Sequence, residues 1–249
     1  MRWISAARSS AGGRPQNEDS LLEWVRDCKG CYVVADGVGG HRGGEVASSI
    51  VTSAFATAFA AVEPLSHASL TKVLLHTHDE VRRAQHDIHT LSGMNSTVVA
   101  LCRQDETVLW GHVGDSRLYH LREGRIIEHT RDHSVCQSLV DRGEIMLQDI
   151  RFHEDRSQLL CGIGMAAELR GEVLLKPCAV QPGDAFLLCT DGWWEYVIEP
   201  EMEVDYMKSQ NPAEWLSRME ERIVKHAQVD HDNYSAIAVW VVESESDHK

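Results

Sequence analysis

The spacing of hydrophobic positions changes along the chain, and each spacing predicts a different element. Short apolar runs rich in β-branched residues, bounded by glycine or polar turns, predict strands. These runs are residues 3–8, 20–25, 31–35, 96–103, 107–113, 117–122, 125–129, 169–175, 185–190 and 234–242. Apolar residues at three- and four-residue steps predict two long helices, one from Val46 to the stop at Pro64 and one from about Ser69 to Leu91.

Two weaker patterns follow in the second half of the chain. Residues 135–142 predict a short helix that ends at Gly143, and the Asn211-Pro212 pair predicts the start of another helix. Residues 144–160 carry many charges and little periodicity, so we expect a mobile excursion there. Because the helices are grouped and do not alternate with single strands, the order favours an α+β fold over a doubly wound parallel sheet.

Composition narrows the class of protein. The chain has 249 residues, with 24 Lys and Arg against 38 Asp and Glu, and its net charge of −14 argues against nucleic acid or an anionic membrane as a partner. We see neither a run of about 18 apolar residues nor a signal-peptide core, so no membrane insertion is expected. Seven scattered cysteines indicate a reducing, cytoplasmic location. We expect one domain over residues 1–243 and a polar tail over residues 244–249.

Aspartates stand where predicted strands end. Asp36, Asp115 and Asp191 each come directly after an apolar strand and beside a glycine, and Asp232 lies just before the last strand. A single aspartate of this kind is most simply a turn former. Four that converge would instead offer the carboxylate oxygens that Mg²⁺ and Mn²⁺ prefer. A neighbouring glycine such as Gly37 would let a backbone carbonyl approach the same ion.

Eight motifs, four of which contain these aspartates, occur in one order. They are residues 14–19 (RPQNED), 34–41 (VADGVGGH), 93–97 (GMNST), 111–117 (GHVGDSR), 130–134 (TRDHS), 182–184 (PGD), 190–192 (TDG) and 232–233 (DN). Each motif alone is a weak signal, but the ordered set closely resembles the metal-dependent serine/threonine protein phosphatases, the PPM or type 2C family, in their bacterial form. The resemblance covers about residues 3–242. It implies a four-layer αββα sandwich, in which two antiparallel sheets pack together and helices lie outside both.

The resemblance also implies a metal site with two or three divalent ions, Mn²⁺ or Mg²⁺. By motif match, Asp36 would bridge two ions and Gly37 would lend its carbonyl oxygen to one of them. Asp191 and Asp232 would bind the other ion. Asp115, together with Asp191, resembles a third and weaker site of bacterial members. Without its metals, such a site would be a repulsive carboxylate cluster, so added Mn²⁺ should raise the melting temperature.

The remaining site residues follow from the first motif. Glu18 and Asp19 would hold metal-bound waters, and Arg14 would bind the phosphate, because its planar donors match phosphate oxygens. The implied reaction is hydrolysis of phosphoserine and phosphothreonine by in-line attack of a metal-bridging hydroxide, without a covalent intermediate. Animal members carry a histidine, a candidate general acid, where this chain has Val38. His41 lies nearby, and protonation by a metal-bound water is an equal alternative.

Three other features are assigned to structure. His133 is expected to be hydrogen-bonded into the scaffold rather than to act as a base. Trp193 and Trp194 are expected to pack in the core, with an aromatic rim beside the site as the alternative. Cys28 and Cys31 form a lone CxxC without a second pair at zinc-ligand spacing, so we interpret them as incidental thiols at a turn.

Residues 143–164 match the family's flap, a mobile segment beside the catalytic cleft. The charged amino-acid composition of this segment resembles that of phosphatases associated with type VI secretion, which oppose a membrane Ser/Thr kinase. The expected partner is a phosphorylated protein, either such a kinase or its target. Two alternatives stay open, a pseudophosphatase that only binds a partner and a hydrolase of small phosphate esters. The first would be expected to lack a core ligand, whereas Asp36, Asp191 and Asp232 are all present.

Overall fold

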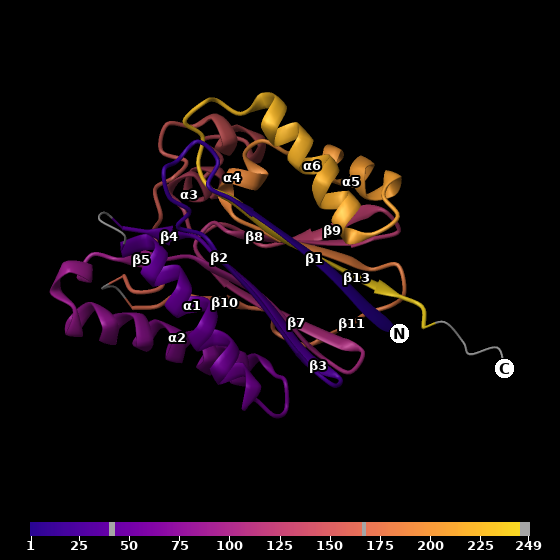
Figure 1. The fold of residues 1–249 in the computed structure, drawn as a ribbon, viewed down its shortest axis with the longest axis horizontal. Coiled ribbons are helices and arrows are strands. Elements are labelled where there is room, and N and C mark those ends of the chain that lie inside the picture. The colour runs from indigo at the N-terminus through magenta and orange to yellow at the C-terminus, as the bar shows by residue number, and fades with distance from the viewer. Residues whose placement is uncertain (40–42, 166–167, 245–249) are drawn as a thin grey trace.

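Two antiparallel sheets form the centre of the molecule (Figure 1). The structure is a computed structural model, and it describes residues 1–39, 43–165 and 168–244. Sheet A has the strand order β1-β13-β12-β8-β9, with bounds Arg2–Ser10, Tyr234–Val242, Ala185–Cys189, Arg117–Arg122 and Arg125–His129. Sheet B has the order β10-β7-β6-β3-β2, with bounds Glu172–Val173, Thr107–Val113, Val98–Gln104, Lys29–Ala35 and Ser20–Arg26. Strand β11 (Cys178–Ala179) also pairs with β7, and β4 (Gly37–Val38) pairs with β5 (Asn95–Ser96).

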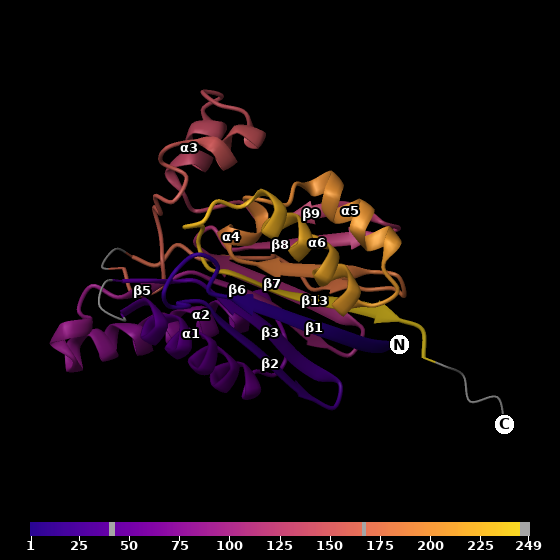
Figure 2. The ribbon, with the colours of Figure 1, turned by 45° about the horizontal axis from the view of Figure 1, so that its top comes forward.

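Helices cover the outer face of each sheet. Helices α1 (Gly43–Ala60) and α2 (His67–Asp87) lie on sheet B, and α5 (Glu199–Lys208) and α6 (Pro212–His226) lie on sheet A (Figure 2). The short helices α3 (Val135–Asp141) and α4 (Asp191–Trp194) lie at one end of the sandwich. The predicted α+β fold with four αββα layers is therefore confirmed.

The central strands show why the layers form. Along β3, Cys31, Val33 and Ala35 face the core under α1 and α2, whereas Tyr32 and Val34 face the core between the two sheets. A strand that is buried on both faces needs a continuous apolar run and not an alternating one, because neither side meets water. All five residues are at most 2% exposed.

Most predicted elements are present, and the differences have local causes. The predicted second helix ends early, at Asp87, because Ile88 takes an extended backbone (φ −126°, ψ 94°), and a separate 3₁₀ turn covers His89–Leu91. The predicted strand over 169–175 is reduced to Glu172–Val173. Helix α5 was not predicted, since it buries little besides Met202 and Asp205 and so shows no apolar stripe. A 3₁₀ helix (Leu147–Phe152) also lies in the expected excursion.

The strand register brings four chain segments to one end of the sandwich. Strands β3, β7 and β12 all end there, and β13 begins there, because Ser20 pairs with Ala35, Val98 with Val113, and Cys189 with Ala236. The predicted strand-end aspartates follow or precede these ends. In the part of the chain that the structure describes, no helix combines the length and apolar character that a membrane crossing requires.

Candidate metal centre

An open cavity of about 750 Å³ occupies this end of the sandwich. Seven of the eight predicted site residues line it, namely Arg14, Glu18, Asp36, Gly37, Asp115, Asp191 and Asp232. Ser157 and Leu159 from the 143–164 segment close one side. The eighth residue, Asp19, lies deeper and adjoins the same carboxylates, since its charge acts on Asp36.

The Asp36 backbone is fixed by the chain segment before β6. The Asp36 N–H donates to Thr97 Oγ1 (2.9 Å), and the Asp36 carbonyl accepts from the Thr97 N–H (2.8 Å) and from Ser96 Oγ (2.7 Å). At Gly37, a Cβ atom would lie 2.0 Å from the Gly44 carbonyl oxygen and 2.6 Å from that of Glu18. Only glycine fits there, so the packing that holds Asp36 in the cavity requires its neighbour to lack a side chain.

A second close backbone approach brings Asp191 beside Asp232. A Cβ atom on Gly192 would lie 2.0 Å from the carbonyl oxygen of Asn233. The Asp191 and Asp232 carboxylates each accept from the next residue's N–H, at 2.7 Å and 2.9 Å. These bonds orient both side chains from rigid turns.

Glu18 and Asp19 are held by the same frame. The Glu18 N–H donates to Asn233 Oδ1 (2.8 Å), and Asn233 also donates to the carbonyls of Ala11 and Gln16 (both 2.9 Å). Asn233 is thus a positioning residue, although its sequence motif alone suggests no role for it. Thr190 Oγ1 donates to Asp19 Oδ2 (3.1 Å), but Asp19 Oδ1 is buried with no hydrogen-bond partner.

The electrostatics are those of a crowded acidic cluster. Burial raises the pKa of Asp36 well above its ordinary value, and the charges of Asp19, Asp191, Asp115 and Asp232 raise it further. Burial likewise raises the pKa of Asp19 to about 7 and that of Asp191 to about 6, with neighbouring aspartates adding to both shifts. Like charges at such proximity favour the neutral form unless a cation is present.

This set of donors fits divalent metal ions. Oxygen ligands from carboxylates and from a backbone carbonyl, such as that of Gly37 in the cavity lining, are those that Mg²⁺ and Mn²⁺ bind. The orphaned oxygen of Asp19 and the mutual repulsion around Asp36 are both relieved by cations in the cavity.

Arg14 is the predicted cation at the rim. Its Nη2 donates to Asp232 Oδ2 (3.1 Å), and the two side chains are 52% and 49% exposed. An exposed pair of this kind contributes little stability, so the guanidinium is free to turn toward an incoming anion. His41 lies outside the described residues, and Val38, which is 44% exposed, places no titratable group at the cavity.

Comparison with known proteins places this site in a family. The sequence model described as Protein phosphatase 2C matches residues 8–232. The chain belongs to the protein phosphatase 2C family. The serine/threonine phosphatase stp of Listeria monocytogenes serotype 4b (strain F2365) is 32% identical over 197 residues, which are 76% of this chain and 77% of that protein.

Solved structures of protein phosphatase 2C relatives share the fold. One is the catalytic domain of the serine/threonine protein phosphatase PstP in complex with two manganese ions. It is 27% identical to this chain with a TM-score of 0.82, and the match covers 97% of this chain and 99% of that one. Another is PppA, described as a key regulatory component of T6SS in Pseudomonas aeruginosa. It is 27% identical to this chain with a TM-score of 0.77, and the match covers 96% of this chain and 98% of that one.

One ion pair beside the centre of this phosphatase 2C chain was not predicted. Arg156, from the 143–164 segment, donates through Nε to Glu195 Oε1 (2.8 Å). Burial raises the pKa of Glu195 to about 7, and the charge of Asp191 adds to the rise, whereas Arg156 lowers it. No local sequence pattern indicates this pair, since the two residues are 39 positions apart.

A cluster of two histidines and a glutamate near the metal centre has the residue types of a metal site, but the protonation of His133 does not suit a metal ligand. Ligand atoms of His112, His133 and Glu172 lie within 4.8 Å of one another. However, the Gly114 N–H donates to His133 Nδ1 (3.1 Å), so a neutral His133 carries its proton on Nε2, the atom that faces Glu172 Oε1 at 3.8 Å. The two imidazoles are also stacked, with an interplanar angle of 6°. Parallel stacked rings cannot both direct a lone pair at one ion, so this cluster supports the predicted structural role of His133.

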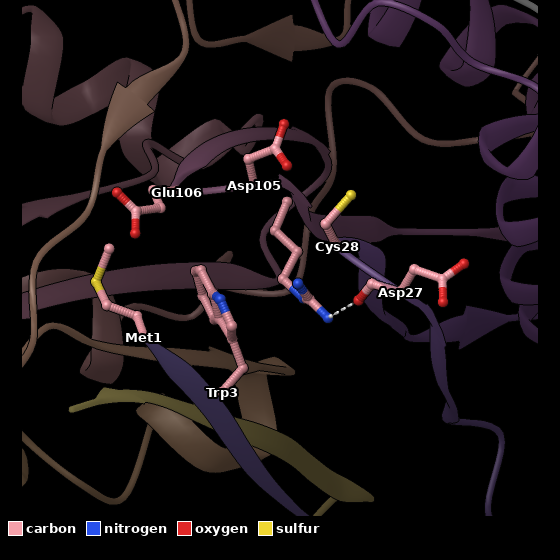
Figure 3. A pocket seen from close by; sticks show the side chains of 7 residues that line it. Met1, Trp3, Asp27, Cys28, Asp105 and Glu106 are labelled. Atoms are coloured by element: carbon pink, nitrogen blue, oxygen red, sulfur yellow. Dashed lines mark hydrogen bonds between the residues drawn. The ribbon is translucent and has the colours of Figure 1, made fainter. Parts of the chain in front are cut away.

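A second cavity, of about 480 Å³, lies at the opposite end of β3 and β7 from the phosphatase 2C centre (Figure 3). Arg103 is one of the residues that line it, with its guanidinium 5.3 Å from the centre of the Trp3 ring and Nη2 donating to the Asp27 carbonyl (3.3 Å). Asp27 and Asp105 both have φ of 53°, which fits residues of tight hairpin turns. The carboxylates around this cavity are thus explained by turn geometry.

Proposed function

We propose that this chain is a metal-dependent phosphoprotein phosphatase that hydrolyses phosphoserine and phosphothreonine. The observation that carries the proposal is the meeting of Asp36, Asp191 and Asp232, with Arg14 at the rim, in one cavity to which four separate segments of the chain contribute these residues. The names of the relatives, which are serine/threonine phosphatases, support the same substrate class.

Three sets of residues would hold the metal ions. Asp36 and the Gly37 carbonyl would hold one ion, and Asp36, Asp191 and Asp232 would hold a second. Asp115, with Asp191, would serve a third. The divalent ions, Mn²⁺ or Mg²⁺, supply Lewis acidity that activates water as the nucleophile and offsets charge on the phosphoryl oxygens.

The chain's other groups act on water and on substrate. Glu18, which lines the cavity, and Asp19, whose Oδ1 has no hydrogen-bond partner among the described residues, would accept hydrogen bonds from ordered water in the centre and so orient it. Arg14 would exchange its exposed contact with Asp232 for the phosphate dianion, whose oxygens match its planar donors. Water would then attack phosphorus in line with the serine or threonine oxygen. The bond from phosphorus to that oxygen breaks, one proton of the water passes to the oxygen, and no covalent enzyme intermediate forms.

A cytoplasmic signalling role follows as part of the proposal. The substrate would be a bacterial Ser/Thr kinase or a target that the kinase phosphorylates. The likeness to PppA, a T6SS component by its description, supports a connection to type VI secretion. A comparison of phosphoproteomes from cells that express the wild type or Asp36→Asn would identify this substrate.

The chemistry is tested by hydrolysis of p-nitrophenyl phosphate with Mn²⁺, with EDTA, and by the variants Asp36→Asn and Asp191→Asn. We expect activity only in the wild type with metal. Metal-independent turnover, or full activity in both variants, would refute the proposal. Absence of divalent-metal binding by calorimetry would favour the pseudophosphatase alternative.

The substrate class needs a separate comparison. Phosphoserine and phosphothreonine peptides should be hydrolysed faster than nucleotides at equal concentration. The reverse order would favour a hydrolase of small phosphate esters, and a preference for phosphotyrosine peptides would contradict the Ser/Thr assignment.

A further inference from the structure

Trp194 lies between two parts of the site that are distant in sequence. Its side chain is fully buried at the end of α4, the helix that begins at Asp191. Its indole Nε1–H donates to the backbone carbonyl of Asp115 (3.0 Å). The ring of one residue therefore touches the backbone of a proposed metal ligand 79 positions away.

The backbone of Asp115 depends on such bonds, because its neighbour Gly114 has a φ of 102° that gives the chain unusual freedom. The Gly114 carbonyl accepts from the His133 backbone N–H (2.9 Å), and the Asp115 carbonyl accepts from the Trp194 indole N–H. The peptide groups on both sides of Asp115 are thus held by hydrogen bonds from elsewhere in the chain. Asp115 is only 4% exposed, and it lines the same cavity as Asp191.

The indole itself is held in place by a buried ion pair. The Arg117 guanidinium lies 3.6 Å from the centre of the Trp194 ring. Asp132 accepts from Arg117 Nε (2.8 Å) and Nη2 (2.7 Å), and both side chains are at most 3% exposed. A bidentate pair of this kind has one geometry, so the ring has little freedom to turn.

The 143–164 segment reaches the same tryptophan from the other side. Arg151 is 8% exposed, and it donates through Nε to the Trp194 carbonyl (2.8 Å) and through Nη2 to Glu199 Oε1 (2.8 Å). The surrounding segment projects from the sandwich, with Met146 65% and Phe152 83% exposed (Figure 2). Arg151 and the adjacent Ile150, which is fully buried, mark where the exposed part of the segment is anchored.

From these contacts we propose that Trp194 is a positioning residue that links docking of the 143–164 segment to the metal centre. When Arg151 is docked, the Trp194 backbone is fixed, and its indole N–H holds the Asp115 carboxylate in its binding position. The link works in both directions, so metal binding at Asp115 and Asp191 steadies the segment to the same extent that the docked segment favours metal. The inference rests on the proposed function, because it takes Asp115 as a metal ligand.

The test measures hydrogen–deuterium exchange in peptides from residues 143–164, with and without Mn²⁺. We expect Mn²⁺ to slow exchange in the wild type and to have a much smaller effect in Trp194→Phe, which keeps the stacked ring but loses the N–H. The matched control is Trp193→Phe, because Trp193 is equally buried and its Nε1 has no hydrogen-bond partner. That variant should retain the wild-type response.

Calorimetry provides the second measurement. Trp194→Phe should weaken the weakest Mn²⁺ binding step by about tenfold, as other groups that orient metal ligands do, while Trp193→Phe leaves it unchanged. Arg151→Lys approaches the link from the segment side and should give the same loss, which keeps the inference testable if Trp194→Phe does not fold.

The outcomes distinguish failure of the proposed function from failure of the link through Trp194. Wild-type protein that binds no Mn²⁺ would refute the proposed function. Wild-type protein that binds Mn²⁺ without protection of residues 143–164, or equal protection in both phenylalanine variants, would overturn the link and leave the proposed function standing.

Discussion

Arg14 Nη2 lies 3.1 Å from Asp232 Oδ2, so the residue proposed to bind phosphate is paired with a residue proposed to bind metal. Both side chains are about half exposed, and such pairs contribute at most about 1 kcal/mol to folding. The pair therefore gives Arg14 a resting position at the rim of the cavity that the substrate phosphate can replace.

Replacing Arg14 with alanine should reduce kcat/KM for a phosphopeptide by about 10- to 100-fold, mainly through KM, because a charge-assisted hydrogen bond to substrate is lost. The melting temperature should change by less than about 3 °C. Steady-state kinetics and a thermal scan measure the two effects.

Arg8→Ala is the matched control. Arg8 pairs with Glu220 at 3.7 Å with a similar exposure of 42%, but neither residue lines the cavity. An unchanged KM in Arg14→Ala, or an equal rise in Arg8→Ala, would remove Arg14 from substrate binding.

Asp36→Asn should abolish activity and yet stabilise the metal-free protein. Loss of a bridging ligand should lower kcat/KM by at least about 100-fold. In EDTA, however, the amide replaces a carboxyl whose ionisation is opposed by burial and by four neighbouring aspartates, and the free energy of unfolding should rise by about 1 kcal/mol or more. Activity assays and urea unfolding measure the two effects.

Asp205→Asn should have the opposite effect on stability. Asp205 is also buried, but it accepts from Arg222 at 2.6 and 2.9 Å, so its charge is paired. Removing that charge should lower the free energy of unfolding by about 2 kcal/mol. If Asp36→Asn were as destabilising as Asp205→Asn, the cluster would not be repulsive.

Added Mn²⁺ should raise the melting temperature of the wild type. A single ion at 100 times its Kd stabilises by about 2.7 kcal/mol, which is roughly 5–10 °C for a chain of this size. The rise should be clearly smaller in Asp36→Asn, because one shared ligand is missing. Differential scanning calorimetry of the EDTA-treated protein, with and without Mn²⁺, gives the comparison, and equal shifts in both proteins would contradict the proposed ligand set.

The candidate ligands could be predicted from sequence because their signal is local. An apolar strand that ends in Asp-Gly, as at Asp36 and Asp191, marks a strand end and a close backbone approach at the same time. The resemblance to a family then supplied the convergence of segments that no local pattern contains.

The links between these residues could not be predicted. The Trp194 hydrogen bond to Asp115 joins positions 79 apart, and the Arg151 bond to Trp194 joins positions 43 apart. Such contacts follow from tertiary packing, in which an indole and a guanidinium look like ordinary core and loop residues when only the sequence is read. Helix α5 was missed for a related reason. It packs on α6 through Met202 and Asp205, and it has no apolar stripe of its own.

His133 should make the metal-free protein less stable in mild acid. Burial, followed by the neighbouring His112, lowers the pKa of His133 to about 4, although Glu172 and Asp132 oppose the shift. In the unfolded chain the ordinary value is about 6.5. Between these values the unfolded state binds the extra proton, so stability is present above about pH 6.5 and is lost as the pH falls toward 4.

His133→Asn isolates this contribution, because the amide oxygen can still accept from the Gly114 N–H while the titrating group is removed. Between pH 7 and pH 5 in EDTA, the wild type should lose about 2 kcal/mol more of its unfolding free energy than His133→Asn does. Urea unfolding at both pH values measures the difference, with His86→Asn as the control at a side chain that is 90% exposed. Because the acidic cluster titrates in both proteins, its effect cancels, and parallel pH profiles for the wild type and His133→Asn would mean that His133 is protonated as easily in the folded protein as in water.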